Sequence, residues 1–457
     1  MNDFLFSIDP STGKEIARFP ITTNEEVERI LNQSTASFTN WSKKSFSERG
    51  EHIRNIAALL RIEKENLARL AASEMGKPVW QGREEVEKCA TTLEFYAEQA
   101  QSMLADVTIK TNASNSFVTY RPLGTILSIM PWNFPFWQVF RAMAPALMAG
   151  NTMVLKHASN VSGCALAIQD IVERAGLPQG VFATLLIPSG RVADVIRHKS
   201  IAAVTLTGST EAGKNVASVA GSVLKKAVLE LGGSDAYIVL DDVDVQKAAR
   251  ICTDGRLKNS GQSCVAAKRF VVVESVLPQF EQAMVEAMLA SKYGNPFEHG
   301  VIVGPMARHD LRDQLHEQVL NSIGAGAKLL CGGFLPDEAG AYYPPTVLTN
   351  VKKEMPAYEE ELFGPVAAII PVKNMEEAIF VANDSEFGLG GAVISNNIEL
   401  ATRLAKEEVD AGNVFVNHFV FSDARLPFGG IKSSGYGREL GSYGILEFVN
   451  VKTVYVA

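Results

Sequence analysis

Residues 125–130 read TILSIM, and four more apolar runs follow: TMVLK at 152–156, FATLLI at 182–187, AAVTLTG at 202–208 and AYIVL at 236–240. Segments with helical periodicity separate these runs. Uninterrupted apolar strands that alternate with helices are typical of a parallel sheet covered by helices. A second alternating region extends from Ala248 to about Phe415, with candidate strands RFVVVE, VAAIIPV and NVFVN. The pattern predicts an α/β protein with two doubly wound parallel-sheet domains.

The segments outside these regions predict a helical layer and a β arm. Residues 24–104 carry apolar side chains at helical spacing among charged neighbours, as at Ile53, Ile56 and Leu60. Residues 107–120 alternate between polar and apolar, as in a hairpin, and the tail ends in the strand-like VKTVYVA. We expect residues 1–104 and 122–232 to form the first domain and residues 233–434 the second. Residues 105–121 and 435–457 would form an arm that pairs with another subunit.

The composition excludes several classes of protein. The chain has 457 residues, of which 47% are hydrophobic and 21% charged, as in an ordinary globular protein of more than one domain. Its net charge of −8 provides no basic field for a nucleic-acid backbone. No run approaches the roughly 18 apolar residues of a membrane span, so we expect no membrane partner and a cytoplasmic location. Five scattered cysteines and seven histidines without ligand spacing predict reduced thiols and no metal site.

The turn at residues 208–214, GSTEAGK, almost matches a nucleotide triphosphate loop. Position 215 is Asn, however, and that loop needs Ser or Thr there to hold magnesium. The dinucleotide fingerprint GxGxxG is absent, as are GxSxG and HExxH. Gly208 and Gly213 therefore have two open interpretations, a tight strand-to-helix turn or an anion site at the helix N-terminus.

Three polar side chains are candidates for catalysis. Cys264 ends the segment NSGQSC, where its neighbours are small and polar instead of apolar as around an inert core thiol. Glu230 lies in VLELGG, where the following glycines allow a ligand to approach closely. Asn133 is a neutral donor in the turn PWNFP. Each also has a structural interpretation: a core thiol, an edge-strand carboxylate and a turn former.

Six segments together resemble the aldehyde dehydrogenase superfamily, in family order and over essentially the full chain. They are PWNFP at 131–135, TGSTEAG at 207–213, ELGGS at 230–234, GQSC at 261–264, EELFGPV at 360–366 and PFGGIKSSGYGRE at 427–439. The resemblance implies that Cys264 attacks the aldehyde carbon, while the Asn133 amide and the Cys264 N–H bind the oxyanion. It also implies that Glu230 activates the water that hydrolyses the thioester, giving a free carboxylic acid. The first domain would bind a dinucleotide, and the second would be catalytic.

The same resemblance assigns the cofactor-binding residues, namely Trp132, Lys156, Ser159, Gly208, Ser209, Gly213, Glu361 and Phe363. Ser209 would contact the pyrophosphate, Glu361 the nicotinamide ribose and Lys156 the adenosine ribose. In strict NAD users, a Glu commonly follows that Lys by three residues, where this chain has Ser159. A cation and a hydroxyl suit a 2′-phosphate, so we expect NADP to be accepted beside NAD, with the preference left open.

The resemblance is strongest with bacterial succinate-semialdehyde dehydrogenases of the shorter type. Arg141, Lys258 and Ser422 match positions where semialdehyde-specific members carry two arginines and a hydroxyl. These groups would bind a distal carboxylate, with charge-assisted hydrogen bonds worth roughly 1.5–3 kcal/mol each. Lys258 lacks the bidentate fork of arginine. Arg141 has an alternative interpretation, a surface or interdomain ion pair.

Other functions remain open at this point. The substrate could be another ω-carboxy aldehyde or a plain aliphatic aldehyde. The chain could also be a non-catalytic binding protein that kept the fold, although intact Cys264, Glu230 and Asn133 argue against it. The family implies a homodimer or homotetramer joined through the arm.

Overall fold

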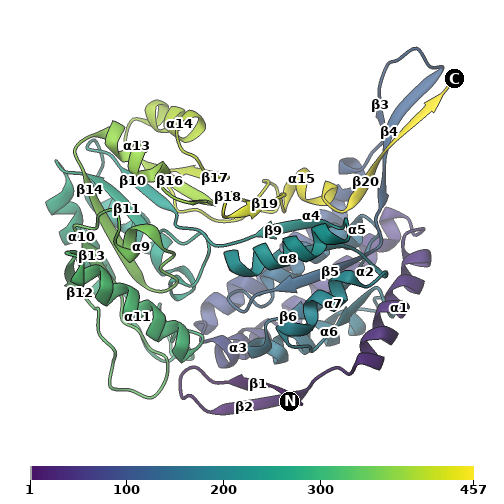
Figure 1. Cartoon of the computed structure of the whole chain (residues 1–457), viewed down its shortest axis with the longest axis horizontal. Helices are drawn as coiled ribbons and strands as arrows, with labels where there is room; N and C mark the ends of the chain where they lie inside the picture. The colour runs from purple at the N-terminus through teal and green to yellow at the C-terminus, as the bar shows by residue number, and fades with distance from the viewer. Residues whose placement is uncertain (1–2) are drawn as a thin grey trace.

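The computed structural model describes residues 3–457 as two α/β domains with a projecting β arm (Figure 1). Each domain is built on its own mostly parallel sheet, one with six strands and one with seven. The predicted fold class is confirmed. Within the described residues, no helix is long and apolar enough to cross a membrane.

The first sheet has the strand order β19-β9-β8-β5-β6-β7, in which only β19 runs antiparallel to its neighbour. β5 and β6 are buried along their whole length, and because helices cover the sheet, their sequences are apolar without interruption. The strands are β5 (Thr125–Met130), β6 (Thr152–His157), β7 (Phe182–Thr184), β8 (Ile201–Thr207), β9 (Lys226–Glu230) and β19 (Gly435–Tyr436). The helices between them are α5 (Trp137–Met148), η1 (Ser159–Val161), α6 (Ser162–Arg174), η2 (Ser189–Arg191), α7 (Val192–Arg197) and α8 (Thr210–Ser222).

Four helices precede this sheet and confirm the predicted helical layer: α1 (Asn24–Trp41), α2 (Phe46–Ile62), α3 (Lys64–Met75) and α4 (Val79–Met103). Capping boxes start the first two, formed by Thr23 with Glu26 and by Ser45 with Glu48. In each box the side chains and main-chain N–H groups satisfy one another reciprocally. The apolar face packs inward, and its members Ile53, Ile56 and Leu60 are fully buried.

The second sheet has the order β12-β13-β14-β11-β10-β16-β17 and is parallel except at β12. The run AYIVL forms β10 and belongs to this sheet, between β11 and β16. The strands are β10 (Ala236–Val239), β11 (Arg269–Val273), β12 (Lys328–Cys331), β13 (Thr346–Thr349), β14 (Val366–Val372), β16 (Gly390–Ile394) and β17 (Asn413–Val416). The helices are α9 (Val245–Leu257), η3 (Lys258–Gly261), α10 (Leu277–Ala290), α11 (His309–Gly324), α12 (Pro356–Glu359), α13 (Met375–Asn383) and α14 (Ile398–Glu407).

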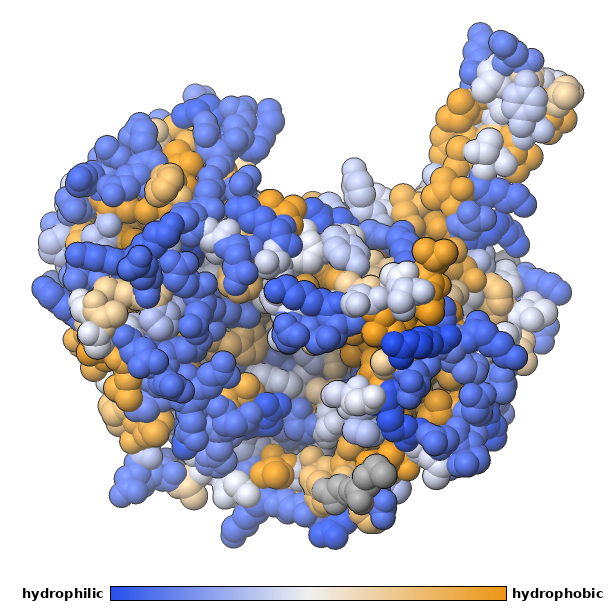
Figure 2. All heavy atoms as spheres, viewed as in Figure 1, coloured by the Kyte–Doolittle hydropathy of each residue, from blue (hydrophilic) through white to orange (hydrophobic). Residues whose placement is uncertain are grey.

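The arm is a three-stranded antiparallel sheet of β3 (Val107–Thr108), β4 (Asn115–Pro122) and β20 (Val449–Val456). It projects from the first domain, and Figure 2 shows apolar side chains gathered along it. Exposed members are Val107, Ile109, Val451, Tyr455 and Val456. Between the second domain and β20, the chain returns to the first domain, where α15 (Gly441–Leu446) packs against α4 and α5.

Two short antiparallel strand pairs complete the structure and were not expected from the sequence. β1 (Phe4–Ile8) pairs with β2 (Glu15–Pro20) at the N-terminal end, and β15 (Phe387–Gly388) pairs with β18 (Ile431–Lys432). After β18, the chain returns to the first domain, where β19 joins the first sheet.

Candidate active site

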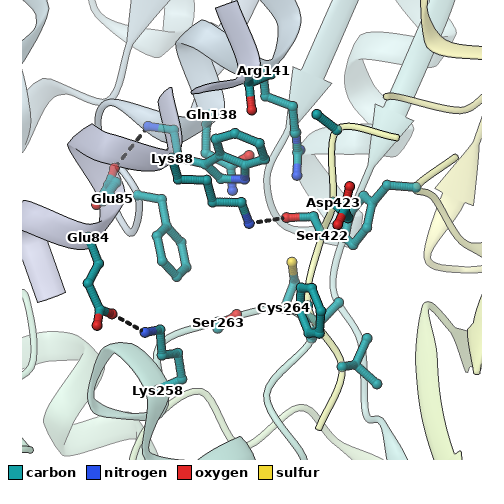
Figure 3. Close-up of a pocket in the computed structure, with 18 of the residues that line it drawn as sticks. Glu84, Glu85, Lys88, Gln138, Arg141, Lys258, Ser263, Cys264, Ser422 and Asp423 are labelled. Carbon is teal, nitrogen blue, oxygen red and sulfur yellow. Dashed lines mark hydrogen bonds and ion pairs between the residues drawn. The ribbon is translucent and has the colours of Figure 1, made fainter. Parts of the chain in front are cut away.

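A cavity of about 730 Å³ is lined by both domains and includes Cys264 on its wall (Figure 3). Helices α4 and α5 form one side, and residues 263–266 together with residues 418–425 form the other. The Cys264 sulfur points into the space between these sides. The candidate nucleophile therefore faces a cavity large enough for a small organic substrate.

Cys264 follows a strained turn that begins where α9 ends. Asn259, Ser260 and Gly261 have positive φ angles of 55°, 57° and 76°. For a residue with a side chain, such a conformation costs about 1–3 kcal/mol, and surrounding contacts must stabilise it. A Cβ on Gly261 would lie 2.3 Å from the carbonyl oxygen of Gly364, so only glycine fits at that position. The strain is located directly before the candidate nucleophile.

Two hydrogen bonds join Asn133 to residues 259–262, and a third lies within that segment. Its Nδ2 donates to the carbonyl oxygen of Gln262 at 3.0 Å. Asn259 Nδ2 donates to the carbonyl oxygens of Asn133 at 2.7 Å and Gln262 at 2.9 Å. An amide nitrogen carries two hydrogens, so Asn133 Nδ2 retains one for a further acceptor. The structure thus brings the Asn133 amide beside the segment that carries Cys264.

The start of α5, just after Asn133, is held by a buried carboxylate. Glu85 Oε1 accepts hydrogen bonds from the N–H groups of Phe136 and Trp137, each at 2.9 Å. The other oxygen of Glu85 accepts from the buried ammonium of Lys77. A carboxylate at a helix N-terminus satisfies otherwise unpaired N–H groups and interacts favourably with the helix dipole. The turn PWNFP is therefore rigid at its C-terminal end.

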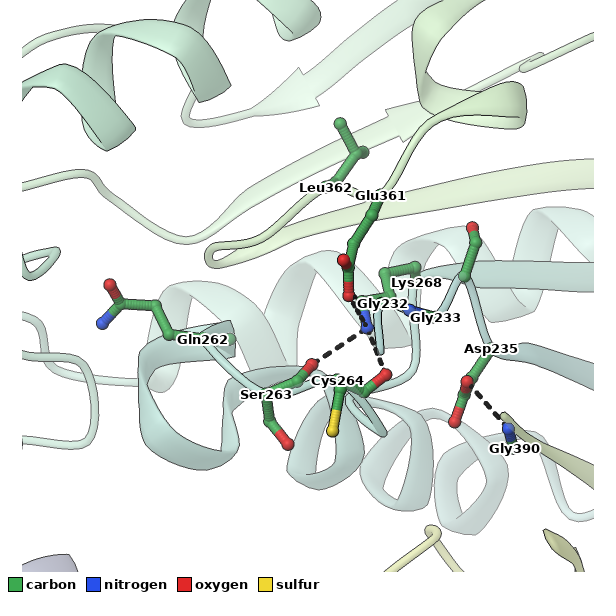
Figure 4. Close-up of polar contacts among 12 residues, drawn as sticks. Gly232, Gly233, Asp235, Gln262, Ser263, Cys264, Lys268, Glu361, Leu362 and Gly390 are labelled. Atoms are coloured by element: carbon green, nitrogen blue, oxygen red, sulfur yellow. Dashed lines mark hydrogen bonds and ion pairs between the residues drawn. The ribbon is translucent and has the colours of Figure 1, made fainter. Parts of the chain in front are cut away.

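Lys268 ties the Cys264 segment to the cofactor candidate Glu361 (Figure 4). Its fully buried Nζ donates to the carbonyl oxygens of Ser263 at 2.9 Å and Cys264 at 2.6 Å. It also forms an ion pair with Glu361 Oε1 at 3.0 Å, and that oxygen accepts from the N–H of Gly233 at 3.1 Å. Sequence analysis did not single out Lys268. The sequence feature that could have indicated its role is the position of this lysine directly before the buried strand RFVVVE.

Burial controls the protonation of Cys264. Desolvation raises the pKa of its thiol to about 12, while the positive charges of Lys268 and Arg141 act in the opposite direction. The carboxylates of Glu361 and Glu230 raise the pKa further. The thiol is therefore neutral near pH 7. The interpretation as an inert core thiol fits the buried cysteines Cys89, Cys164 and Cys252 instead.

Glu230 is the last residue of β9, and its carboxyl group is buried. Neither carboxyl oxygen forms a hydrogen bond with any residue of the described range 3–457. Burial raises the pKa of Glu230 well above its ordinary value, and the charge of Glu439 adds to this, against the opposing effects of Arg141 and Arg438. A Cβ on Gly429 would lie 2.7 Å from Glu230 Oε1, so that glycine leaves room for the carboxyl group. A buried carboxyl group without a partner has the environment of a catalytic acid or base.

Three cofactor candidates lie where strands of the first sheet end. Lys156 is the second-last residue of β6 and is 6% exposed, and its Nζ makes no hydrogen bond or ion pair with another residue between positions 3 and 457. Burial lowers the pKa of this lysine. Ser159 opens η1 three residues later, and Ser209 is the N-cap of α8, with Oγ accepting from the N–H of Ala212. A buried ammonium without a counter-charge, together with a free helix N-terminus, fits the ribose and phosphates of a dinucleotide.

The glycines of the 208–214 turn have different roles. A Cβ on Gly213 would lie 2.4 Å from Leu231 Cδ1, so a side chain there would require Leu231, just after β9, to move away from α8. At Gly208, the nearest atom to a Cβ would be 3.6 Å away, so packing alone does not require glycine. Gly213 thus has a role in the packing of α8, and Gly208, where a side chain would meet no close neighbour, stays a candidate for close approach to a ligand.

The nicotinamide candidates come from both domains. The rings of Trp132 and Phe363 meet edge to face, with centroids 5.8 Å apart and planes at 90°. A Cβ on Gly232 would lie 2.6 Å from Glu361 Oε2, which places the Glu361 carboxylate against the ELGGS segment. Lys268 links Glu361 to the segment that carries Cys264, so this group of candidates lies beside the candidate nucleophile.

Arg141 lines the cavity but also forms a buried ion pair. It pairs with Glu439, and its Nη2 donates to Thr207 Oγ1 at 3.2 Å. Its guanidinium lies 5.0 Å from the centre of the Phe428 ring. The alternative interpretation of Arg141 as an ion pair therefore agrees with the structure, and Glu439 is a partner that sequence analysis did not identify.

The other two substrate candidates also line the cavity. Lys258 Nζ lies 2.6 Å from Glu84 Oε2, in an exposed ion pair. Ser422 Oγ accepts from Lys88 Nζ at 2.7 Å. Lys88 was missed by sequence analysis. Its signal was a polar stripe at helical spacing on α4, made of Gln81, Glu85, Lys88 and Thr92, all of which line the cavity.

Comparison with known proteins covers the whole chain. The sequence pattern of the aldehyde dehydrogenase family matches residues 3–454. A probable succinate-semialdehyde dehydrogenase for NADP(+) from Synechocystis sp. is 48% identical over 451 residues, which cover 99% of each chain. A succinate semialdehyde dehydrogenase for NAD(P)+ from Escherichia coli is 46% identical, with 98% of this chain and 97% of the relative covered.

Solved structures give the same result. The crystal structure of succinic semialdehyde dehydrogenase from Streptococcus pyogenes in complex with NADP+ superimposes with a TM-score of 0.97. It is 35% identical in sequence, and the match covers 99% of both chains. The chain therefore belongs to the aldehyde dehydrogenase family, as its six motifs predicted.

Proposed function

We propose that this protein oxidises succinate semialdehyde to succinate, with NADP+ or NAD+ as the electron acceptor. The observation that carries the proposal is the cavity that contains the Cys264 thiol together with cationic groups from Lys88, Arg141 and Lys258. Cations on the wall of the cavity that the thiol faces suit a substrate that carries a carboxylate in addition to the aldehyde. The names of the relatives at 46% and 48% identity support the same substrate.

In the first step, the sulfur of Cys264 bonds to the aldehyde carbon, and the carbonyl oxygen gains negative charge. The remaining hydrogen of Asn133 Nδ2 and the N–H of Cys264 are the donors that would stabilise this oxygen. The thiol must first release its proton to solvent, and its pKa of about 12 makes the thiolate a minor species at neutral pH. Lys268 and Arg141 are the positive charges that stabilise the thiolate when it forms.

A bound nicotinamide would accept the hydride that leaves the thiohemiacetal carbon. Lys156 and Ser159 would hold the adenosine ribose or its 2′-phosphate, and Ser209 would hold the pyrophosphate at the start of α8. Glu361 would bind the nicotinamide ribose, with Lys268 fixing its carboxylate. Trp132 and Phe363 would exclude water beside the ring.

Glu230 is the base proposed for the last step. As the carboxylate, it would take a proton from a water molecule that attacks the thioester carbon, which releases succinate and regenerates the Cys264 thiolate. Its raised pKa makes it a stronger base than an ordinary carboxylate, at the cost of a smaller ionised fraction at neutral pH. Arg141 and Arg438 are the charges that favour the ionised form.

The exposed apolar strands of the arm support a further part of the proposal, that the protein works as a homo-oligomer. β20 and β4 leave apolar side chains such as Val451 and Tyr455 at the surface. A second copy of the chain would cover them. Light scattering of the purified protein, compared with a variant in which both residues are Asp, measures whether the arm joins the copies.

The substrate proposal is tested by steady-state kinetics on the purified protein. We expect kcat/KM for succinate semialdehyde to exceed that for butanal, its uncharged analogue without the carboxylate, at saturating NADP+. Equal values, or a preference for butanal, would exclude the carboxylated aldehyde as the favoured substrate.

A further inference from the structure

Lys88 differs from the other cations of the cavity wall because, within residues 3–457, it forms no ion pair. Its Nζ donates to Ser422 Oγ at 2.7 Å and lies 4.1 Å from the centre of the Trp137 ring. An aromatic face and a hydroxyl hold the ammonium in position without neutralising it.

The remaining cations on the cavity wall are already neutralised. Arg141 is paired with buried Glu439, and Lys258 with Glu84 at 2.6 Å. Removing Arg141 from Glu439 would leave a buried charge without a partner, which is strongly unfavourable. Two other charged residues of the wall also have partners within the protein: Arg425 pairs with Asp423, and Glu85 pairs with Lys77. A substrate carboxylate could therefore pair with Lys88 without displacing a carboxylate of the protein.

Lys88 and Ser422 approach each other from opposite sides of the cavity, and the Cys264 sulfur points toward the space between them (Figure 3). Lys88 comes from α4 of the first domain, and Ser422 from the segment after β17 of the second. The Ser422 oxygen accepts from Lys88, so its own hydrogen is free to donate to a third group. The pair therefore offers two donors to one acceptor inside the cavity that holds the nucleophile.

We propose that Lys88 is the specificity-determining residue of this site and that, with the Ser422 hydroxyl, it binds the distal carboxylate of the substrate. The carboxylate occupies the free side of the ammonium, and the aldehyde carbon then lies toward Cys264. This inference rests on the proposed function, because it requires a substrate that carries a carboxylate. It differs from the sequence-based expectation, in which Arg141 and Lys258 bind that group.

The charge environment of Lys88 adds a pH signature to the geometry. Burial lowers the pKa of Lys88 to about 7, and the charges of Arg141 on α5 and Lys258 on η3 act in the same direction. Asp423 on the segment after β17 and Cys89 on the same helix oppose them. The amine thus loses its charge as the pH rises above about 7, and carboxylate binding, which favours the charged form, weakens over the same range.

The test compares two aldehydes on the full-length protein, succinate semialdehyde and butanal, with NADP+ saturating. We expect Lys88→Met to lower kcat/KM for succinate semialdehyde about 10-fold or more, mainly through KM, and to leave butanal nearly unchanged. Arg83→Met is the matched control, because Arg83 lies on the same helix but pairs with Glu65 at the surface. Equal losses on both aldehydes, or an unchanged preference, would overturn the proposal.

A second variant, Lys88→Arg, keeps the proposal testable if Lys88→Met folds poorly. Its test is the pH dependence of the ratio of kcat/KM for succinate semialdehyde to kcat/KM for butanal. In this ratio, the effects of groups whose titration changes both rates equally, such as Cys264, cancel. In the wild-type protein we expect this ratio to fall as the pH rises from 6 to 9, through the Lys88 pKa of about 7. In Lys88→Arg it should stay flat, because guanidinium remains charged. A wild-type ratio that does not change with pH would count against Lys88.

The outcomes separate this inference from the proposed function. If the wild-type protein shows no preference for succinate semialdehyde, the proposed substrate is wrong and the role of Lys88 with it. If the preference exists but Lys258→Met removes it while Lys88→Met does not, the proposed function stands and the carboxylate binds at Lys258. If Lys88→Met loses the preference and Lys258→Met keeps it, the result supports both the proposed function and the role of Lys88.

Discussion

The ammonium nitrogen of Lys268 lies 2.6 Å from the main-chain carbonyl oxygen of Cys264. The same nitrogen binds Ser263 and Glu361, so one buried cation connects the nucleophile segment with a residue proposed to bind the cofactor. The strained turn before Cys264 is held by contacts of its own, such as Asn259 Nδ2 donating to the carbonyl oxygen of Asn133, whereas Lys268 binds the main chain that follows the turn. Lys268 therefore positions Cys264 without touching the substrate.

Replacing Lys268 by methionine should lower both stability and activity. The variant leaves the carbonyl oxygen of Cys264 without a donor, which costs about 1–3 kcal/mol, whereas Ser263 O still accepts from the N–H of Ala266. Thermal unfolding and kcat report the two effects. Lys406→Met, in an exposed part of α14, is the matched control and should change the free energy of unfolding by less than about 0.5 kcal/mol. A Lys268→Met protein with wild-type kcat would show that the position of Cys264 does not depend on this contact.

Cofactor choice should depend on Lys156 and Ser159. We expect Lys156→Ala to lower kcat/KM for NADP+ roughly 10- to 150-fold, which corresponds to one lost charge-assisted hydrogen bond, and to affect NAD+ less. Ser159→Glu should reverse the selectivity, because its carboxylate repels a 2′-phosphate and accepts from ribose hydroxyls. Steady-state kinetics with both cofactors measure these ratios. A wild-type protein that uses only NAD+ would refute the assignment.

The pKa of Cys264 predicts how the resting protein reacts with iodoacetamide. Only the thiolate reacts, and with a pKa of about 12 its fraction grows about tenfold for each pH unit. The alkylation rate should therefore rise steadily between pH 7 and 10 without a plateau. The Cys264→Ser variant identifies the label that belongs to this residue. A plateau near neutral pH would mean that the thiol is already ionised at rest.

Glu230→Gln should slow hydrolysis of the thioester and make the acyl-enzyme accumulate. General-base catalysis contributes about 100-fold or more, so the intact mass after rapid quenching should show a succinyl adduct on the variant. Because the pKa of Glu230 is raised, the wild-type hydrolysis rate should fall as the pH decreases and the carboxylate is protonated. Glu317→Gln, on the exposed side of α11, is the control. Absence of an adduct on Glu230→Gln would assign the base to another group.

The main architecture was predictable from the sequence because it depends on local patterns. The runs at β5, β6 and β8 are apolar throughout, and strands buried on both faces require such sequences. The motifs likewise located Cys264, Asn133 and the strand end at Glu230. The N-terminal hairpin β1–β2 was not predicted, since its strands are partly exposed and carry no clear alternation.

The electrostatic arrangement of the site was not predictable in the same way. Arg141 and Glu439 are almost 300 residues apart, and only the fold shows that they neutralise each other. Lys88 and Ser422 meet across the two domains, so the sequence of α4 alone could not show that the ammonium faces the cavity. Whether a charged residue is free to bind a ligand depends on such distant partners.

The most direct measurement of the central claim is the rate at which purified Cys264→Ala oxidises succinate semialdehyde with NADP+. The protein should fold like the wild type, because alanine is compatible with the partly exposed site. We predict that reduced cofactor does not form above background, while the wild-type protein turns over under the same conditions. Oxidation by Cys264→Ala at the wild-type rate would contradict covalent catalysis by this residue.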